Sequence, residues 1–262
     1  MAKLIINSDD FGYSKGINHA ILDTHIDGVL TSTTLLANLT GFDHAIALAR
    51  ENQTLGIGVH LSMTLGEPVL HNVDQLINEK GEFKQLKDLK DHPQDVCLEQ
   101  LYDEWDAQIK KVKATGIPIT HLDSHHYAHS FGNNYQVIEA LAEKYQIPLR
   151  NCYGVKRKLI NPELAPAESF WNLFNYPSMK VVDQDYLAVQ SPMFEIISRD
   201  AEKNKNYQIV EAVCHPGYVD STVWLGSSFN LARMREVEVL CDPIFKKCLL
   251  NNGYELCRYD EL

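Results

Sequence analysis

Acidic and histidine residues recur at the ends of short apolar runs, and these residue types are the ones best suited to chemistry. Carboxylate oxygens and imidazole nitrogens bind divalent metals and exchange protons, so their recurrence predicts a metal-binding or acid–base site. The positions concerned are Asp9, Asp10, His60, His215 and the segment 121–129.

The segment 121–129 is the densest of these groups, with four histidines and one aspartate. Imidazoles are poor core fillers unless they are paired, so packing alone does not explain this density. A solvated surface loop is the structural alternative. In an extended strand the side chains alternate, which would place His121, Asp123 and His125 on one face and Ser124 and His126 on the other.

One aspartate and two histidines would make a three-ligand metal site with an open position, as catalytic metals require. This donor set suits zinc or another divalent transition ion better than magnesium. On an extended backbone the side chains of Asp9 and Asp10 diverge, so one could bind metal while the other faces the substrate. The alternative is that one of them caps the following turn.

A second carboxylate near the metal could take a proton from water, and a histidine elsewhere could protonate the leaving group. His215, in Cys214-His215-Pro216-Gly217, is such a histidine. Since Pro-Gly is turn chemistry, this segment could equally be a simple strand-to-turn boundary. For His60 taken alone, a buried imidazole bonded to the backbone is the alternative.

The hydrophobic pattern predicts elements that would bring these residues together. Strands are expected at 3–7, 31–37, 55–60, 119–122, 147–151, 207–214 and 254–259. Helices are expected at 14–28, 42–51, 94–114, 134–145, 192–204 and 242–252. This alternation predicts an α/β fold with a parallel sheet of about seven strands, a barrel or near-barrel. In such folds ligands gather at the carboxyl ends of the strands.

The pattern contains no linker or repeat, so we expect a single catalytic domain over 1–262. Irregular insertions are expected near 62–93 and 152–190, where Gly, Pro and charged residues cluster.

Composition restricts the function classes. The formal charge of -11 disfavours nucleic acid and anionic membrane surfaces as partners. No window approaches the roughly 20 apolar residues of a membrane span, so we expect none. We also expect no signal peptide, because the apolar run in the first residues is too short for one. The six cysteines show no C-x-x-C spacing, so we expect free thiols and a cytoplasmic location.

At the chemistry-bearing positions the sequence resembles the YdjC-like carbohydrate deacetylases, a family that includes chitooligosaccharide deacetylases. The matching segments are Asn7–Gly12, Gly58–Leu61, Thr120–His126, Cys214–Gly217 and Glu238–Pro243. They occur in the right order over nearly the whole chain. Tyr127-Ala128 departs from the pattern, which would have an apolar residue and then histidine there.

The resemblance implies a distorted (β/α) barrel of the TIM type and one divalent metal ion, Mg or Zn. Asp10, His60 and His125 would hold the metal. Asp9 would be the general base, and His215 would act as the acid or stabilise the oxyanion. The reaction would be hydrolysis of the N-acetyl group of an amino sugar or chitooligosaccharide, which releases acetate. A homodimer is a family-level expectation.

Four residues are predicted to contact the carbohydrate: Arg150, Tyr218, Trp224 and His126. A further group of aromatic side chains could stack on sugar rings, although core packing or a dimer contact is the preferred interpretation; its members are Phe170, Trp171, Phe174 and Tyr176.

Two other functions remain open. A different metallohydrolase such as a phosphoesterase would need phosphate-binding Lys or Arg, and the motif segments contain none. A non-catalytic sugar-binding relative would not need the full set of acidic and histidine residues. No Walker A, G-x-G-x-x-G or G-x-S-x-G sequence occurs.

Overall fold

A curled parallel sheet forms the centre of the computed structural model, which describes residues 1–151, 161–173, 179 and 182–262. Within those residues the sheet has seven strands, in the order β4-β3-β2-β1-β6-β5, with β7 paired to the start of β1. The strands are β1 (Ala2–Phe11), β2 (Ser32–Leu35), β3 (Gly56–Leu61), β4 (Leu122–Ser124), β5 (Ser169–Asn172), β6 (Ile209–Cys214) and β7 (Tyr254–Leu256).

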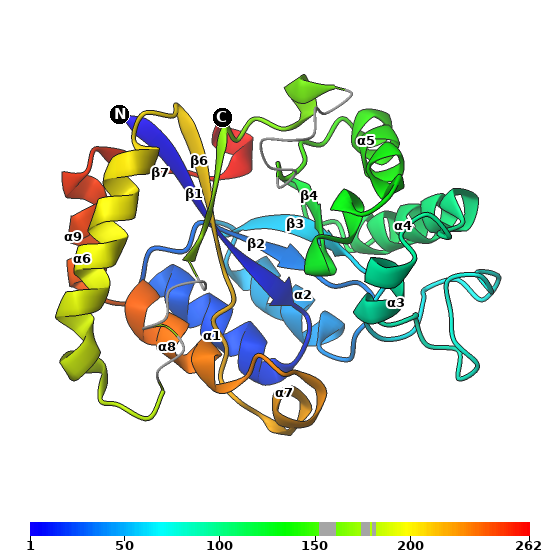
Figure 1. Ribbon diagram of the computed structural model, residues 1–262, viewed down its shortest axis with the longest axis horizontal. Helices are drawn as coiled ribbons and strands as arrows, with labels where there is room; N and C mark the ends of the chain where they lie inside the picture. The colour runs from blue at the N-terminus through cyan, green and yellow to red at the C-terminus, as the bar shows by residue number, and fades with distance from the viewer. Residues whose placement is uncertain (152–160, 174–178, 180–181) are drawn as a thin grey trace.

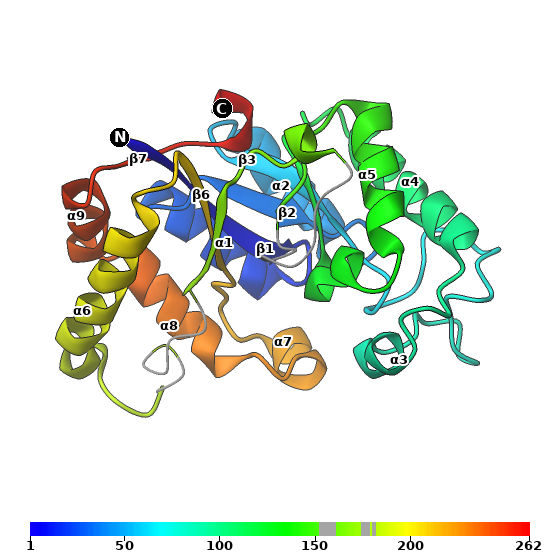
Figure 2. The same cartoon turned by 45° about the horizontal axis from the view of Figure 1, so that its top comes forward.

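Helices surround this sheet (Figures 1 and 2). They are α1 (Lys15–Ile26), α2 (Phe42–Glu51), α3 (Leu86–Asp91), α4 (Leu98–Lys113), α5 (Asn134–Tyr145), α6 (Tyr186–Asn204), α7 (Ser221–Gly226), α8 (Leu231–Leu240) and α9 (Pro243–Asn251). Their apolar faces form the core against the sheet. In α4, for example, Leu101, Trp105, Ile109 and Val112 are fully buried, at the spacing of one helix face.

The sheet curls into a half-barrel, which confirms the predicted distorted barrel. Beyond β4 the chain continues the sheet, because the Arg150 N–H donates to the Leu122 carbonyl over 2.9 Å. The next residue, Asn151, donates its side-chain amide to the Ala167 carbonyl over 3.1 Å, just before β5. The two edges of the sheet are thus drawn toward each other, and the carboxyl ends of the strands share one mouth.

Several elements differ from the expectation. The predicted strand 147–151 makes only a single bridge, between Leu149 and Leu122. The stretches expected to be irregular contain α3, β5 and the first turns of α6, which begins before Pro192. Helix α8 was not expected. Its buried face includes Arg233, Arg235 and Glu236, so the sequence has no clear apolar stripe there.

No helix in the described ranges is both long and apolar enough to span a membrane. The described cysteines, 97, 214, 241, 248 and 257, are free thiols.

Candidate active site

A cavity of about 470 Å³ opens at the carboxyl ends of β1, β3, β4 and β6. All five residues that the motifs place in a metal or catalytic role line it: Asp9, Asp10, His60, His125 and His215. These residues come from four strand ends that are far apart in the chain but lie along the same edge of one parallel sheet, in which only β2 intervenes between β3 and β1.

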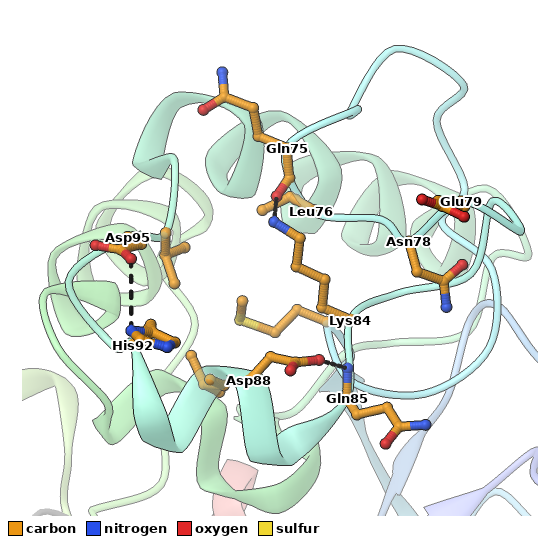
Figure 3. A pocket seen from close by; sticks show the side chains of 12 residues that line it. Gln75, Leu76, Asn78, Glu79, Lys84, Gln85, Asp88, His92 and Asp95 are labelled. Atoms are coloured by element: carbon orange, nitrogen blue, oxygen red, sulfur yellow. Dashed lines mark hydrogen bonds and ion pairs between the residues drawn. The ribbon is translucent and has the colours of Figure 1, made fainter.

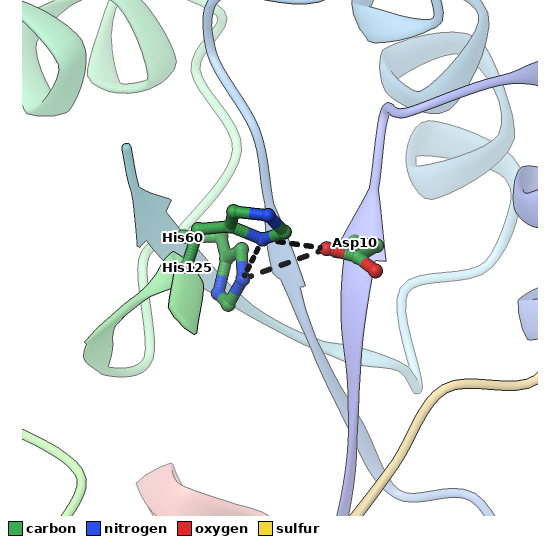
Figure 4. A group of neighbouring side chains, drawn as sticks. All are labelled: Asp10, His60 and His125. Carbon is green, nitrogen blue, oxygen red and sulfur yellow. Dashed lines mark hydrogen bonds and ion pairs between the residues drawn. The ribbon is translucent and has the colours of Figure 1, made fainter. Parts of the chain in front are cut away.

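Three potential metal ligands meet in this cavity (Figure 4). The Asp10 Oδ1 atom lies 3.1 Å from His125 Nδ1 and 3.6 Å from His60 Nε2. The two imidazole nitrogens are 3.3 Å apart. Asp10 Oδ1 is buried without a hydrogen bond among the described residues, which is the state expected of a ligand atom. The donor set therefore fits a divalent transition ion.

The backbone of Asp10 explains how two adjacent carboxylates reach one cavity. Asp10 has φ +73°, and the β1–β2 register shifts between Ser8 and Phe11. This bulge breaks the alternation that would send the side chains of Asp9 and Asp10 in opposite directions. Aspartate tolerates the left-handed region better than most residues, but the conformation still costs of order 1 kcal/mol. Strain at this position is typical of a functional site.

His60 is oriented by Asp123, whose Oδ1 lies 2.6 Å from His60 Nδ1. Asp123 also accepts a hydrogen bond from Thr34 Oγ1 over 3.0 Å. A carboxylate behind a metal-binding histidine fixes which ring nitrogen is presented, in this case Nε2. A second group of possible ligands, Asp9, His60 and Asp123, also occurs. Arg150 already binds the carboxylates of Asp9 and Asp123, so the first group fits a cation better.

The local field favours a positive charge at the three-ligand cluster. Burial would lower the pKa of His60, but the carboxylates of Asp123, Asp9 and Asp10 outweigh burial and raise it to about 9. Burial would raise the pKa of Asp10, but Arg233, His125 and His60 hold it well below its usual value. A field that retains a proton on His60 also attracts a metal cation.

Asp9 is held by Arg150, which is completely buried. The Nη2 and Nη1 atoms donate to Asp9 Oδ1 and Oδ2 over 2.7 and 2.9 Å. The same guanidinium contacts Asp123 Oδ2 at 2.8 Å and Glu211 Oε1 at 2.8 Å. Burial would raise the pKa of Asp9, but Arg150 and, to a smaller extent, His60 and His215 lower it to about 2. Asp9 is therefore ionised at neutral pH.

His215 lies directly after β6, with Nε2 at 3.7 Å from Asp9 Oδ2. Its backbone N–H donates to the buried carboxyl of Glu236 in α8. Burial lowers the pKa of His215 to about 4, against the opposing effect of the Asp9 and Asp10 carboxylates. The imidazole is thus neutral at neutral pH. Burial raises the pKa of Glu236 to about 8.

The four predicted carbohydrate contacts lie in different parts of the structure. His126 lines the cavity, and its Nδ1 lies 3.0 Å from Thr64 Oγ1. Arg150 does not line it; its guanidinium is fully buried and bound to three carboxylates, and its predicted substrate contact stays a prediction. Tyr218 and Trp224 lie outside the lining, and the Tyr218 hydroxyl instead donates to Asp23 over 2.6 Å. Their contact with substrate stays a prediction.

The histidine cluster does not follow strict alternation. Asp123 and His125 belong to the site, but the ring of His121 is buried and stacked on Tyr259, with 4.0 Å between centroids. Strand β4 ends at Ser124, and His126 and Tyr127 both have positive φ. This turn carries both side chains into the cavity lining.

Among the aromatic residues near β5, Trp171 is buried in the core, which is one of the two interpretations preferred from the sequence. Phe170 is half-buried and packs edge-on against Tyr127. Phe174 and Tyr176 lie outside the described residues.

The motifs did not identify several residues of the site. Tyr13, Lys87, Phe229 and Arg233 line the cavity. Arg233 is the most informative, because its Nη2 donates to Asp10 Oδ2 over 2.7 Å. A charged residue in a helix is usually solvated, so the sequence offered no signal for this contact.

A second cavity of about 420 Å³ lies next to the first and shares Gln85 with it. Met63, Leu76, Leu89 and Val96 form apolar parts of its wall, and polar side chains form the rest. Figure 3 shows Lys84 reaching to the Gln75 carbonyl on one side, and His92 facing Asp95 on another. The first turn of α3 separates the two cavities, because Leu86 and Lys87 line the first and Asp88 and Leu89 the second.

Comparison with known proteins finds similar chains over nearly the whole sequence. A family model described as YdjC-like protein matches residues 3–251. A carbohydrate deacetylase of Brevibacillus brevis is 36% identical, with 99% of each chain covered. A carbohydrate deacetylase of Clostridium beijerinckii is 31% identical, over 99% of this chain and 100% of that one.

A crystal structure from Enterococcus faecalis, described as a proposed cellobiose-phosphate cleavage protein, superposes with a TM-score of 0.84. It is 31% identical, and the match covers 99% of this chain and 98% of that one. The chain therefore belongs to the YdjC-like carbohydrate deacetylase family.

Proposed function

We propose that this chain hydrolyses the N-acetyl group of an amino sugar or chitooligosaccharide, releasing acetate, with one divalent cation held by Asp10, His60 and His125. The observation that carries the proposal is the convergence of Asp10 Oδ1, His60 Nε2 and His125 Nδ1 beside Asp9 and His215 in one cavity. The names of the curated relatives supply the reaction class. Zinc suits the two imidazole ligands better than magnesium does.

When bound, the cation would polarise the amide carbonyl and lower the pKa of water. Asp9, ionised and fixed by Arg150, would accept the proton from the attacking water. Because Arg150 holds both oxygens, the carboxylate keeps one orientation, at the cost of reduced basicity.

His215 would act as a neutral hydrogen-bond donor to the oxyanion that forms at the carbonyl. An imidazole whose pKa is about 4 is neutral at pH 7 and carries a proton on only one ring nitrogen. It can therefore donate a hydrogen bond from that neutral N–H group. Of the two predicted roles for His215, this electrostatic role is therefore the one we propose.

The adjoining second cavity supports a substrate longer than one sugar. A chain with its acetyl group at Asp10 could pass Gln85 and reach the apolar wall beyond. Substituting Gln85→Trp should raise KM for chitooligosaccharides by a larger factor than KM for a monosaccharide, because Gln85 borders both cavities. Gln136→Trp, at an exposed position of α5 outside both linings, serves as the matched control for a bulky exposed substitution.

A phosphate-releasing reaction is the second candidate. Lys87 lines the cavity, outside the motif segments, and the Enterococcus protein is described in terms of a sugar phosphate. A panel of N-acetylated mono- and oligosaccharides and sugar phosphates, assayed for both acetate and inorganic phosphate, separates the two. Acetate release alone supports the deacetylase; phosphate release alone overturns it. The predicted homodimer and cytoplasmic location stay predictions.

A further inference from the structure

A buried arginine of α8 connects the candidate metal ligand Asp10 to the turn that carries His215. Arg233 is only 3% exposed, and all three guanidinium nitrogens donate hydrogen bonds. Nη2 donates to Asp10 Oδ2 over 2.7 Å, Nη1 to the His215 carbonyl over 3.3 Å, and Nε to the Phe229 carbonyl over 2.7 Å. One planar group thus links the end of β1 to the turn after β6 and to the residue that lies just before α8.

The contact with Asp10 is specific to one oxygen. Arg233 occupies Oδ2, whereas Oδ1 is the atom that faces His60 and His125. A carboxylate with one oxygen held by a guanidinium has the other oxygen available for a cation, and so binds it through a single atom. Arg233 also supplies the positive charge that keeps Asp10 ionised in a buried site.

The surroundings of Arg233 are shaped to hold it. Its guanidinium lies over the Phe229 ring, 5.4 Å from the centroid, and that ring packs edge-on against His215. At Gly217, an added Cβ would lie 2.9 Å from Arg233 Cδ and 3.1 Å from Ile17 Cγ1. The backbone of Gly217 does not have positive φ, so glycine there provides room for the arginine stem and not a special turn.

We infer that Arg233 is a positioning residue that makes Asp10 a one-oxygen metal ligand and fixes it relative to His215. The inference rests on the proposed metal site. Lysine cannot replace arginine here, because a point charge cannot hold three acceptors in fixed directions.

The test compares Arg233→Lys and Arg233→Met with the wild type, with Zn²⁺ binding measured by calorimetry on folded protein. We expect the Kd to rise by about 10- to 100-fold, the usual effect of removing a residue that orients a ligand. In the cobalt(II)-loaded protein the visible absorption spectrum should change, since Asp10 is then free to bind through both oxygens. Gly217→Ala, which retains Arg233 but displaces its stem, should change the spectrum in the same direction.

Arg235→Met is the matched control. Arg235 is a buried arginine on the same helix, but it bonds to the Gln184 carbonyl and pairs with Glu238, away from the cavity. The Arg235→Met substitution should lower the Tm without changing the Kd for Zn²⁺ or the cobalt(II) spectrum. If Arg233→Met lowers only the Tm, as the control does, Arg233 is merely structural and the inference is wrong. If the wild type binds no divalent metal, the proposed metal site itself fails.

Discussion

Arg150 binds both carboxylate oxygens of Asp9, with N–O distances of 2.7 and 2.9 Å, although the two residues are 141 positions apart in the chain. The same guanidinium reaches Glu211, whose other oxygen accepts a hydrogen bond from the Tyr259 hydroxyl over 2.5 Å. The candidate base is therefore tied, through a buried ionic network, to the last residues of the chain.

Two replacements of Arg150 distinguish the effect of its positive charge on stability from the effect of its two-oxygen contact with Asp9 on catalysis. Arg150→Met leaves three buried carboxylates without their cation, and we expect a loss of about 3–5 kcal/mol in the free energy of unfolding. Arg150→Lys keeps the charge but cannot bind both Asp9 oxygens, so kcat should fall at least tenfold in a folded protein. Urea unfolding and acetate release measure the two effects. Wild-type kcat in Arg150→Lys would show that the two-oxygen contact has no catalytic role.

Asp9→Asn removes the candidate base while preserving size and most hydrogen bonds. Turnover should fall by about 10²–10⁴-fold, the usual contribution of a general base. Zn²⁺ affinity should stay within a few-fold of the wild type, because Asp9 is not among the three proposed ligands. The pair of measurements is kcat for acetate release and Kd by calorimetry. Activity near that of the wild type would assign the proton transfer to another group.

The sequence predicts those strands and helices that have a clear apolar pattern of their own. It predicts those site residues that lie in the acidic and histidine motifs. The strand ends at Asp10, His60 and His215 stand out because acidic or histidine residues occur there close behind short, largely apolar runs. Arg150 was predicted only as a carbohydrate contact and Arg233 was not predicted at all, because their carboxylate partners lie far away in the sequence.

The missed elements have a similar cause. Helix α8 buries charged residues as well as apolar ones, which removes the amphipathic signal. Strand β5 is four residues long and lies in a stretch whose Pro, Gly and polar residues suggest a loop. The bulge at Asp10 depends on pairing with β2, so a strand pattern alone predicts the wrong relation between Asp9 and Asp10.

The protonation state of His215 determines whether kcat should rise or fall with pH. If the neutral imidazole is the active form, kcat should increase with pH through about 4 and stay level from pH 6 to 8. If the imidazolium were required, kcat would instead fall as the pH rises above that value. The pH profile of kcat decides between them. His215→Gln, which retains an N–H donor but does not titrate, should keep part of the activity and lose the acidic limb due to His215.

Metal binding should release a proton from His60. Its pKa of about 9 in the metal-free protein means that the ring is protonated at pH 7.5, and a cation at Nε2 must displace that proton. Metal affinity should therefore rise with pH up to about 9 and level off above it. Calorimetry in two buffers of different ionisation enthalpy counts the protons, and we expect a value near one per metal. A count of zero would contradict metal binding at His60.

Acetate release from an N-acetylated oligosaccharide, measured before and after removal of metal, decides whether the chain is a metal-dependent deacetylase. Chelation should abolish acetate release, and about one equivalent of Zn²⁺ should restore it. The same addition should not restore activity to His125→Ala, which lacks one of the three ligands. Full acetate release from thoroughly chelated protein would show that the hydrolysis needs no metal ion.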